Sequence, residues 1–247
     1  MTTAHPPLLL VENIAKHFRG LRAVDGVSFR VEAGEITALI GPNGAGKTTV
    51  FNMIAGVFEP DDGRIELDGR SLVGLRPDQV CRAGIGRTFQ LVKPFGNLSV
   101  EENVVVGALR WTHDVGQARR LAIEVLELLG LADKRRLAAR SLTLPDRKCL
   151  EVARALATKP KLLLLDEVMA GLRPAETDRM VATFQRLNRD TGLTIVLIEH
   201  VMRAVMALSH RVVVINSGKP VCEGLPADIV RDPRVLECYL GEEGAPC

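Results

Sequence analysis

The chain has 247 residues, 47% of them hydrophobic and 25% charged, which is enough for one large domain or for a main domain with a small annex. Its net charge of +2 excludes a strong general attraction to nucleic acid or anionic lipid, and its aromatic content of 4% argues against a base-stacking surface. No apolar run reaches the roughly 18 residues that a membrane span needs.

The first part of the chain shows the short apolar and alternating patterns of strands. We predict strands at residues 8–13, 27–31 and 36–40, a helix over 47–56 that a glycine-rich loop opens, and a strand at 64–68. Turn signals, "PDDG" and "DG", stand on both sides of this last strand and support its limits.

From about residue 76 to 157 the pattern changes to apolar residues at spacings of three and four, as in amphipathic helices. The segments that carry this spacing read "EENVVVGALR", "QARRLAIEVLELLGL" and "RKCLEVARALAT". We therefore predict a helical subdomain that is inserted into an α/β core.

Two continuous apolar runs follow, "KLLLLDE" at 161–167 and "TIVLIEH" at 194–200, and they suit buried parallel strands. A helix over about 174–189 connects them into a βαβ unit. We also predict a strand at 211–216 and a short tail helix at 226–231.

Two further features predict a cytosolic location. The N-terminal segment "MTTAHPPLLLVEN" has neither the basic region nor the apolar stretch of a signal peptide. The cysteines show no CxxC pairing and no zinc spacing, so we expect reduced thiols. They are Cys81, Cys149, Cys222, Cys238 and Cys247.

The segment "GPNGAGKTT" at 41–49 follows a predicted strand, opens a predicted helix and matches GxxxxGK[ST], the Walker A pattern. Its glycines let backbone N–H groups surround a phosphate without Cβ clashes, and the helix N-terminus adds partial positive charge. Lys47 is expected to reach the β- and γ-phosphates, and Thr48 to bind Mg²⁺. The predicted nucleotide-binding residues of this loop are Gly41, Pro42, Asn43, Gly44, Ala45, Gly46, Lys47, Thr48 and Thr49.

Two carboxylates follow the first of the apolar runs. Asp166 suits the Mg²⁺ shell, and Glu167 suits the polarisation of a water molecule against the γ-phosphate. His200 ends the next strand, at the edge of an α/β sheet where ligands bind. Gln90 in "GIGRTFQ" would by itself also fit a solvated loop. Phe18 in "KHFRG" would by itself also fit a position in the core.

The order of these features, from Phe18 and the Walker A loop through Gln90, "ARAL" and "LLLLDE" to His200, resembles that of ATP-binding cassette (ABC) ATPases over residues 8 to about 242. The resemblance implies that Phe18 stacks on adenine, that Gln90 completes the Mg²⁺ and water shell, and that His200 contacts the γ-phosphate. The implied catalytic residues are Glu167, His200 and Gln90, and the implied Mg²⁺ residues are Thr48, Gln90 and Asp166.

In ABC ATPases two such domains meet head to tail, and each ATP lies between the Walker A loop of one and the signature loop of the other. The helical subdomain and the loop after Gln90 dock on membrane permeases. The implied fold is an α/β P-loop ABC ATPase with a mixed or parallel core sheet, an N-terminal antiparallel β part and an inserted helical subdomain. We expect one domain over 1–247, with its core at about 8–75 and 158–225, the helical subdomain at 76–157 and a tail at 226–247.

A narrower resemblance to the ATPases of branched-chain amino-acid importers rests on "GLRAVDGVSF", "LSVEENV", "LEVARALATKPKLLLLDE" and the tail "GLPADIVRDPRVLECYLGEE". It implies an ATP-hydrolysing motor that uses Mg²⁺ and lies in the cytoplasm, on the inner face of the membrane. The implied partners are two permeases, a second ATPase and, indirectly, a solute-binding protein. A heterodimer is favoured and a homodimer is possible, and no nucleic-acid partner is expected.

Three alternatives remain. The ATPases of lipid or lipopolysaccharide export share much of the same tail. A non-transport ABC protein that clamps DNA or the ribosome would call for a coiled-coil insertion, a second cassette or a basic face, and the sequence has none of these. A subunit that binds ATP without hydrolysing it conflicts with the intact Glu167.

The sequence departs from the ABC family at the signature pentapeptide, which is commonly leucine, serine, glycine, glycine and glutamine. Here it falls on Leu142, Thr143, Leu144, Pro145 and Asp146. Pro145 offers no N–H group to a partner's γ-phosphate, and Asp146 adds a negative charge there. Val168 and Arg173 also replace a common proline and aspartate, which puts the coupling of two equal sites in doubt.

Overall fold

The structure is a computed structural model that describes residues 6–240. Three predictions concern residues outside this range: that the N-terminal segment is not a signal peptide, that Cys247 is a reduced thiol, and that the tail extends to residue 247. Within the described part of the chain, no helix is both long and apolar enough to cross a membrane. The four cysteines in this part are free thiols, as predicted.

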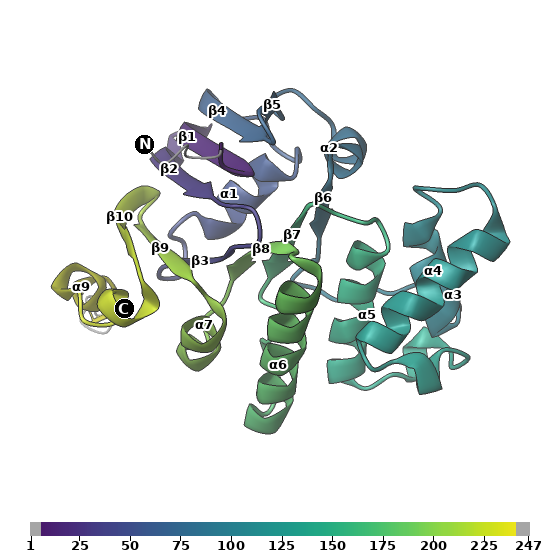
Figure 1. Cartoon of the computed structure of the whole chain (residues 1–247). Coiled ribbons are helices and arrows are strands. Elements are labelled where there is room, and N and C mark those ends of the chain that lie inside the picture. The colour runs from purple at the N-terminus through teal and green to yellow at the C-terminus, as the bar shows by residue number, and fades with distance from the viewer. Residues whose placement is uncertain (1–5, 241–247) are drawn as a thin grey trace, which may run out of the picture.

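A four-stranded antiparallel sheet lies beside the N-terminal end of the chain (Figure 1), in the order β2-β1-β4-β5. Its strands are β1 (Leu9–Phe18), β2 (Leu21–Val31), β4 (Asp62–Leu67) and β5 (Arg70–Ser71). The β1–β2 hairpin is longer than the two predicted strands at 8–13 and 27–31. Register shifts between Val11 and His17 interrupt the alternation of side chains, so the sequence pattern breaks before the strand ends.

A six-stranded sheet forms the centre of the molecule, in the order β10-β9-β3-β8-β7-β6. Its strands are β3 (Ile36–Ile40), β6 (Ile85–Arg87), β7 (Leu162–Asp166), β8 (Thr194–Ile198), β9 (Arg211–Asn216) and β10 (Lys219–Gly224). Its pairs are parallel, except that β10 runs antiparallel to β9. The carboxyl ends of β3, β7 and β8 therefore meet at one edge of the sheet.

Two of these strands correct the sequence prediction. Residues 85–87 were placed in the helical subdomain, yet they pair with β7 as β6. Three residues are too few to show a periodic pattern. Strand β10 was not predicted, because Pro220 and Gly224 weaken its strand pattern; both are tolerated because β10 is an edge strand.

The helix α1 (Lys47–Ile54) packs between the two sheets, where Val50, Phe51 and Ile54 are fully buried. Alternate residues of the central sheet face opposite sides. Leu39 packs in the core around α1, whereas Ala38, on the other face, packs in a second core that the helices between residues 100 and 208 help to form. These helices include α6 (Pro174–Thr191), which follows the prediction at 174–189, and α7 (Met202–Leu208), which was not predicted.

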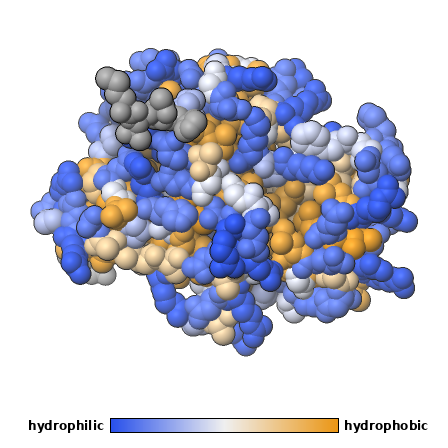
Figure 2. Space-filling model, in the orientation of Figure 1, coloured by the Kyte–Doolittle hydropathy of each residue, from blue (hydrophilic) through white to orange (hydrophobic). Residues whose placement is uncertain are grey.

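The helical part contains α2 (Pro77–Ala83), α3 (Val100–Ala108), α4 (Val115–Leu128) and α5 (Leu144–Leu156). The three amphipathic segments seen in the sequence form α3, α4 and α5, as predicted, and α3 packs against the other two. Ser99 and Glu102 form a capping box at the start of α3. Figure 2 shows a mainly hydrophilic face with an apolar area over α4 and α5.

The tail forms two short helices, α8 (Pro226–Ile229) and α9 (Pro233–Leu240), where one helix at 226–231 was predicted. Pro233 starts the second helix, since proline suits a first helical turn. The side chain of Asp232 accepts a hydrogen bond from the N–H group of Arg234 at 2.9 Å and ties that turn to the preceding loop.

Candidate functional site

The Walker A loop joins β3 to α1 at the carboxyl edge of the central sheet. Gly41 and Gly46 adopt φ angles of 154° and 98°, which other residues rarely do. A Cβ atom at Gly41 would lie 2.0 Å from the carbonyl oxygen of Ile215, and one at Gly46 would lie 2.4 Å from that of Ala23. These two positions therefore require glycine and seat the loop against β9 and β2.

A cavity of about 630 Å³ lies over this loop, which is the size of a small-ligand site. Residues 43–49 line it together with Phe18, Gln90, Glu167 and His200. The fold thus brings together residues from five separate segments, which the sequence analysis assigned to one site. Gly41 and Pro42, the remaining loop residues, are buried and do not line it.

Lys47 is buried at the start of α1. Its Nζ atom donates hydrogen bonds to the carbonyl oxygens of Gly41 at 2.7 Å and Pro42 at 2.6 Å. The ammonium group and the first N–H groups of α1 give this end of the cavity positive character. Such a cradle suits a chain of phosphates.

Glu167 adopts a left-handed backbone conformation with a φ angle of 50°, directly after β7. Its Oε2 atom accepts a hydrogen bond from Nε2 of Gln90 at 2.7 Å, and its Oε1 atom lies 2.9 Å from Nε2 of His200. Its carbonyl oxygen accepts a hydrogen bond from Nζ of Lys148 at 2.9 Å. Both carboxylate oxygens and the backbone of Glu167 are therefore held in place, as the positioning of a general base requires.

Asp166 is the buried last residue of β7. Its Oδ2 atom accepts a hydrogen bond from Nη2 of Arg87 at 3.1 Å, and its N–H group donates to Oγ1 of Thr88. Burial raises the pKa of Asp166, and the Arg87 guanidinium opposes this rise. The other carboxylate oxygen, Oδ1, is buried and has no hydrogen-bond partner within the described residues.

The unpartnered oxygen of Asp166 provides a test of whether a divalent cation fits the site. Asp166, Thr48 and Gln90 line a further cavity of about 460 Å³. Carboxylate, hydroxyl and amide oxygens are the ligands that Mg²⁺ prefers. The residues present therefore fit Mg²⁺.

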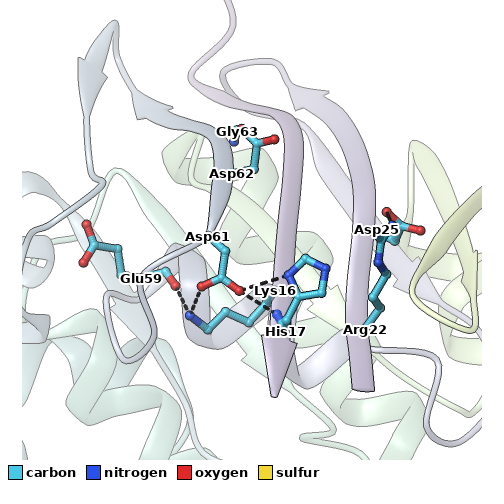
Figure 3. A network of polar contacts seen from close by, with 8 residues as sticks. All are labelled: Lys16, His17, Arg22, Asp25, Glu59, Asp61, Asp62 and Gly63. Carbon is cyan, nitrogen blue, oxygen red and sulfur yellow. Dashed lines mark hydrogen bonds and ion pairs between the residues drawn. The ribbon is translucent and has the colours of Figure 1, made fainter. Parts of the chain in front are cut away.

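Phe18 lies at the end of β1, 38% exposed, with its ring edge-to-face on Phe58 at 5.1 Å between centroids. Asp61 holds this strand end in place, as Figure 3 shows. Its carboxylate accepts hydrogen bonds from Nζ of Lys16 at 2.6 Å and from the N–H group of His17 at 2.7 Å. The hydrogen bond from Lys16 is the main reason why the pKa of Asp61 falls to about 2. The phenyl ring is thus a fixed wall of the cavity.

The altered signature segment does not line this cavity. Thr143 caps α5 and donates a hydrogen bond to Oδ2 of Asp146 at 2.7 Å, while Pro145 lies in the first turn. Nζ of Lys134 lies 2.7 Å from Oδ1 of Asp146. From the sequence we expected the negative charge of Asp146 to face a partner's phosphate, whereas in the structure Lys134 forms an ion pair with it. Burial acts to raise the pKa of Asp146, but hydrogen bonds from Lys134 and Thr143 outweigh it and lower the pKa.

Three charged residues beside the acidic pair were not predicted: Arg87, Lys148 and Glu199. Burial lowers the pKa of Lys148 and raises that of Glu199 to about 7. Glu199 accepts a hydrogen bond from the N–H group of Met169 at 2.9 Å. One signal was available in the sequence, since Glu199 directly follows the apolar run of β8. Nothing in the sequence indicated the partners of Arg87 and Lys148.

A family model described as "ABC transporter" matches residues 24–170, more than half of the 247 residues. The chain belongs to the ABC transporter family. It is therefore a P-loop ATPase with the ABC fold, and the predicted family, fold and enzyme class are confirmed. A second model, described as "Branched-chain amino acid ATP-binding cassette transporter", matches residues 219–245 of this ABC protein.

Curated relatives resemble this ABC protein over nearly their whole length. The high-affinity branched-chain amino acid transport ATP-binding protein BraF of Pseudomonas aeruginosa is 38% identical, with 96% of this chain and 98% of BraF covered. LivG of Escherichia coli K12, of the same description, is 39% identical at the same coverage. The lipopolysaccharide export system ATP-binding protein LptB of that organism is 36% identical, with 95% and 98% covered.

Solved structures agree with this membership of the ABC family. The crystal structure of the ADP conformation of an ATP-binding cassette from an ABC transporter superposes with a TM-score of 0.87 at 30% identity, covering 96% of this chain and all of the other. A nucleotide-free cassette superposes with a TM-score of 0.86, also at 30% identity, over 95% of this chain and 99% of the other.

Proposed function

We propose that this chain is the ATP-hydrolysing motor subunit of an ABC importer for branched-chain amino acids. The observation that carries the hydrolytic role is the Glu167 carboxylate, which Gln90 and His200 hold at the Walker A cavity. The solute class is supported by the descriptions of BraF and LivG and by the family match at residues 219–245.

In the proposed reaction the Walker A loop binds the phosphates of ATP. The N–H groups at the start of α1 and the ammonium group of Lys47 supply positive charge, and Phe18 supplies an aromatic face for adenine. Thr48, Gln90 and Asp166 would hold Mg²⁺, which neutralises charge on the phosphates when it is bound. These residues bind and orient the nucleotide and leave the reacting bond beside Glu167.

Glu167 is proposed to accept the proton of the attacking water. The contacts of its carboxylate with Gln90 and His200 fix the direction in which it can act, and the contact from Lys148 fixes its backbone. His200 is in addition proposed to contact the γ-phosphate. Orientation of a base by fixed neighbours lowers the barrier because less reorganisation is needed during the reaction.

The proposed partners are two permeases in the membrane, a second ATPase and, through the permeases, a solute-binding protein. The chain would lie on the cytoplasmic face of the membrane. A lipid or lipopolysaccharide export role is the second candidate, because LptB is 36% identical. It predicts a different permease and no branched-chain amino-acid uptake.

The proposed permease site is an apolar groove of about 260 Å³ between α2, β6, α3 and α5. Phe89 and Val106 line it and are 55% and 44% exposed. Leu91, which lines the neighbouring cavity together with Phe89, is 69% exposed. Exposed apolar side chains around a hollow are typical of a protein-binding surface. The groove lies next to the loop after Gln90, which the sequence predicted as the docking segment.

Cysteine crosslinking tests this docking site. In a cysteine-free form of the chain within the assembled transporter, Leu91→Cys and Val106→Cys should form crosslinks to a permease cysteine. Arg30→Cys, on an exposed position of β2, should not, because β2 lies in the other sheet. Absence of permease crosslinks from both Leu91→Cys and Val106→Cys would reject the docking proposal.

The altered signature segment favours a heterodimer with unequal sites. In a homodimer both composite ATP sites would contain Pro145, which lacks an N–H group. In a heterodimer, this chain's Walker A loop can face a glycine-bearing signature segment of the partner. The intact residues around Glu167 are useful only where at least one site hydrolyses ATP. The pairing of Asp146 with Lys134 leaves the missing donor as the main defect.

Restoring two glycines tests this interpretation. The double change Leu144→Gly and Pro145→Gly should raise phosphate release by the isolated chain, compared at matched dimer fraction, by up to roughly 10- to 150-fold, the value of one charge-assisted hydrogen bond in the transition state. The control Leu144→Ala with Pro145→Ala restores the donor without the flexibility and should give a smaller rise. A wild type already as fast as the glycine variant would favour a homodimer.

A further inference from the structure

Arg87, the last residue of β6, lies between the candidate metal site and the apolar groove. Its side chain is 11% exposed. Its Nη1 atom donates a hydrogen bond to Oδ1 of Asn52 at 2.7 Å, and its Nη2 atom donates to Oδ2 of Asp166 at 3.1 Å. The guanidinium thus bridges α1, which follows the Walker A loop, to the acidic end of β7.

This bridge fixes one side of the Asp166 carboxylate. Oδ2 is occupied by Arg87, whereas Oδ1 is buried and has no hydrogen-bond partner within residues 6–240. A planar guanidinium with two anchored nitrogens restricts the rotation of the carboxylate that it holds. The unpartnered oxygen is therefore the one that remains for a cation. Groups that orient a metal ligand in this way typically change metal affinity when they are removed.

Arg87 also lines the groove. Its guanidinium lies 5.4 Å from the centroid of the Phe89 ring, within the range of a cation–π contact. Arg87 and Phe89 line both the apolar groove and the neighbouring cavity that contains Thr48 and Asp166. The pair therefore forms part of the wall between the two spaces.

We propose that Arg87 is a positioning residue that holds Asp166 for the metal ion and transmits the occupancy of the groove to it through Phe89. This inference rests on the proposed function, because it takes a permease segment as the occupant of the groove. An apolar segment over Phe89 would exclude water from Arg87, and the ion pair with Asp166 is stronger where water is excluded. Docking would thereby favour the carboxylate orientation that binds metal.

Binding of Mn²⁺ to the full-length chain, measured by electron paramagnetic resonance with a saturating non-hydrolysable ATP analogue, tests the positioning role. Arg87→Met should weaken Mn²⁺ binding by about 10- to 100-fold, as expected for the loss of a group that orients a metal ligand. Arg87→Lys keeps the charge and should restore part of the affinity. Binding of the analogue without metal should stay unchanged in both variants.

A double-mutant cycle tests the link to the groove. Phe89→Ala should weaken Mn²⁺ binding by about two- to fivefold, the value of an exposed cation–π contact, and should have no further effect in the Arg87→Met background. Phe95→Ala is the matched control, because Phe95 is also half exposed and stacks at 4.9 Å on an arginine, Arg154, that does not contact Asp166. It should leave Mn²⁺ affinity unchanged.

Wild-type Mn²⁺ affinity in Arg87→Met would overturn the positioning role. An equal effect of Phe89→Ala with and without Arg87 would overturn the link. Where Arg87→Met does not fold, Asn52→Ala removes the other anchor of the guanidinium, and unchanged Mn²⁺ affinity in that variant would equally reject the inference. Failure of the wild type to bind the ATP analogue would instead reject the proposed function, so the two failures are distinguishable.

Discussion

Replacing Glu167 with glutamine should slow ATP turnover in the assembled transporter by roughly 10²- to 10⁴-fold, the usual contribution of a positioned base. Glutamine keeps the shape of the side chain and can keep a hydrogen bond with Gln90, but it cannot take a proton from water. The Walker A loop, Lys47 and Phe18 are untouched by the change. ATP affinity should therefore be preserved while hydrolysis is lost.

Steady-state phosphate release and ATP titration of the same preparation separate these two effects. Glu124→Gln makes the same chemical change on an exposed position of α4 and should have no effect on either measurement. Full turnover in the Glu167→Gln complex would show that another group polarises the water. The contacts of Glu167 with Gln90 and His200 would then be structural only.

Lys47→Ala should weaken ATP binding by about 10- to 150-fold, the cost of one lost charge-assisted hydrogen bond to the phosphates. The variant also leaves the carbonyl oxygens of Gly41 and Pro42 without the bonds that Lys47 gives them. Loss of both charge and loop support makes this the change with the largest expected effect on binding.

Titration calorimetry on the isolated chain measures this effect. Lys161→Ala is the matched control, since Lys161 is half exposed and pairs with Asp68 rather than with the loop. A thermal unfolding curve shows whether each variant remains folded. Unchanged ATP affinity in folded Lys47→Ala would remove the proposed role of the Walker A loop in binding.

Sequence reasoning is most informative where the signal is local. The Walker A loop is one continuous segment, and the acidic pair directly follows a buried strand, so both could be read without knowledge of the fold. The long amphipathic segments of α3, α4 and α5 were identified for the same reason. The short strand β6 and the bulged strand β1 were missed or shortened, because neither presents an unbroken pattern.

The rest of the site depends on partners that are distant in the sequence. Arg87 meets Asp166 across 79 positions, and Gln90 meets Glu167 across 77. Lys134 neutralises Asp146 from a different segment, which changes how the altered signature segment is interpreted. Propensities and motif spacing do not encode such pairings, because tertiary packing creates them. The pairing of β6 with β7, for example, places Arg87 beside Asp166.

Uptake of radiolabelled leucine by proteoliposomes tests the central claim most directly. The liposomes would contain this chain, its permeases and the second ATPase, with the solute-binding protein added outside and ATP supplied inside. The account predicts leucine uptake that requires ATP and is lost when Glu167→Gln replaces the wild-type chain. Hydrolysis of ATP without uptake of leucine or another branched-chain amino acid would contradict the proposed importer.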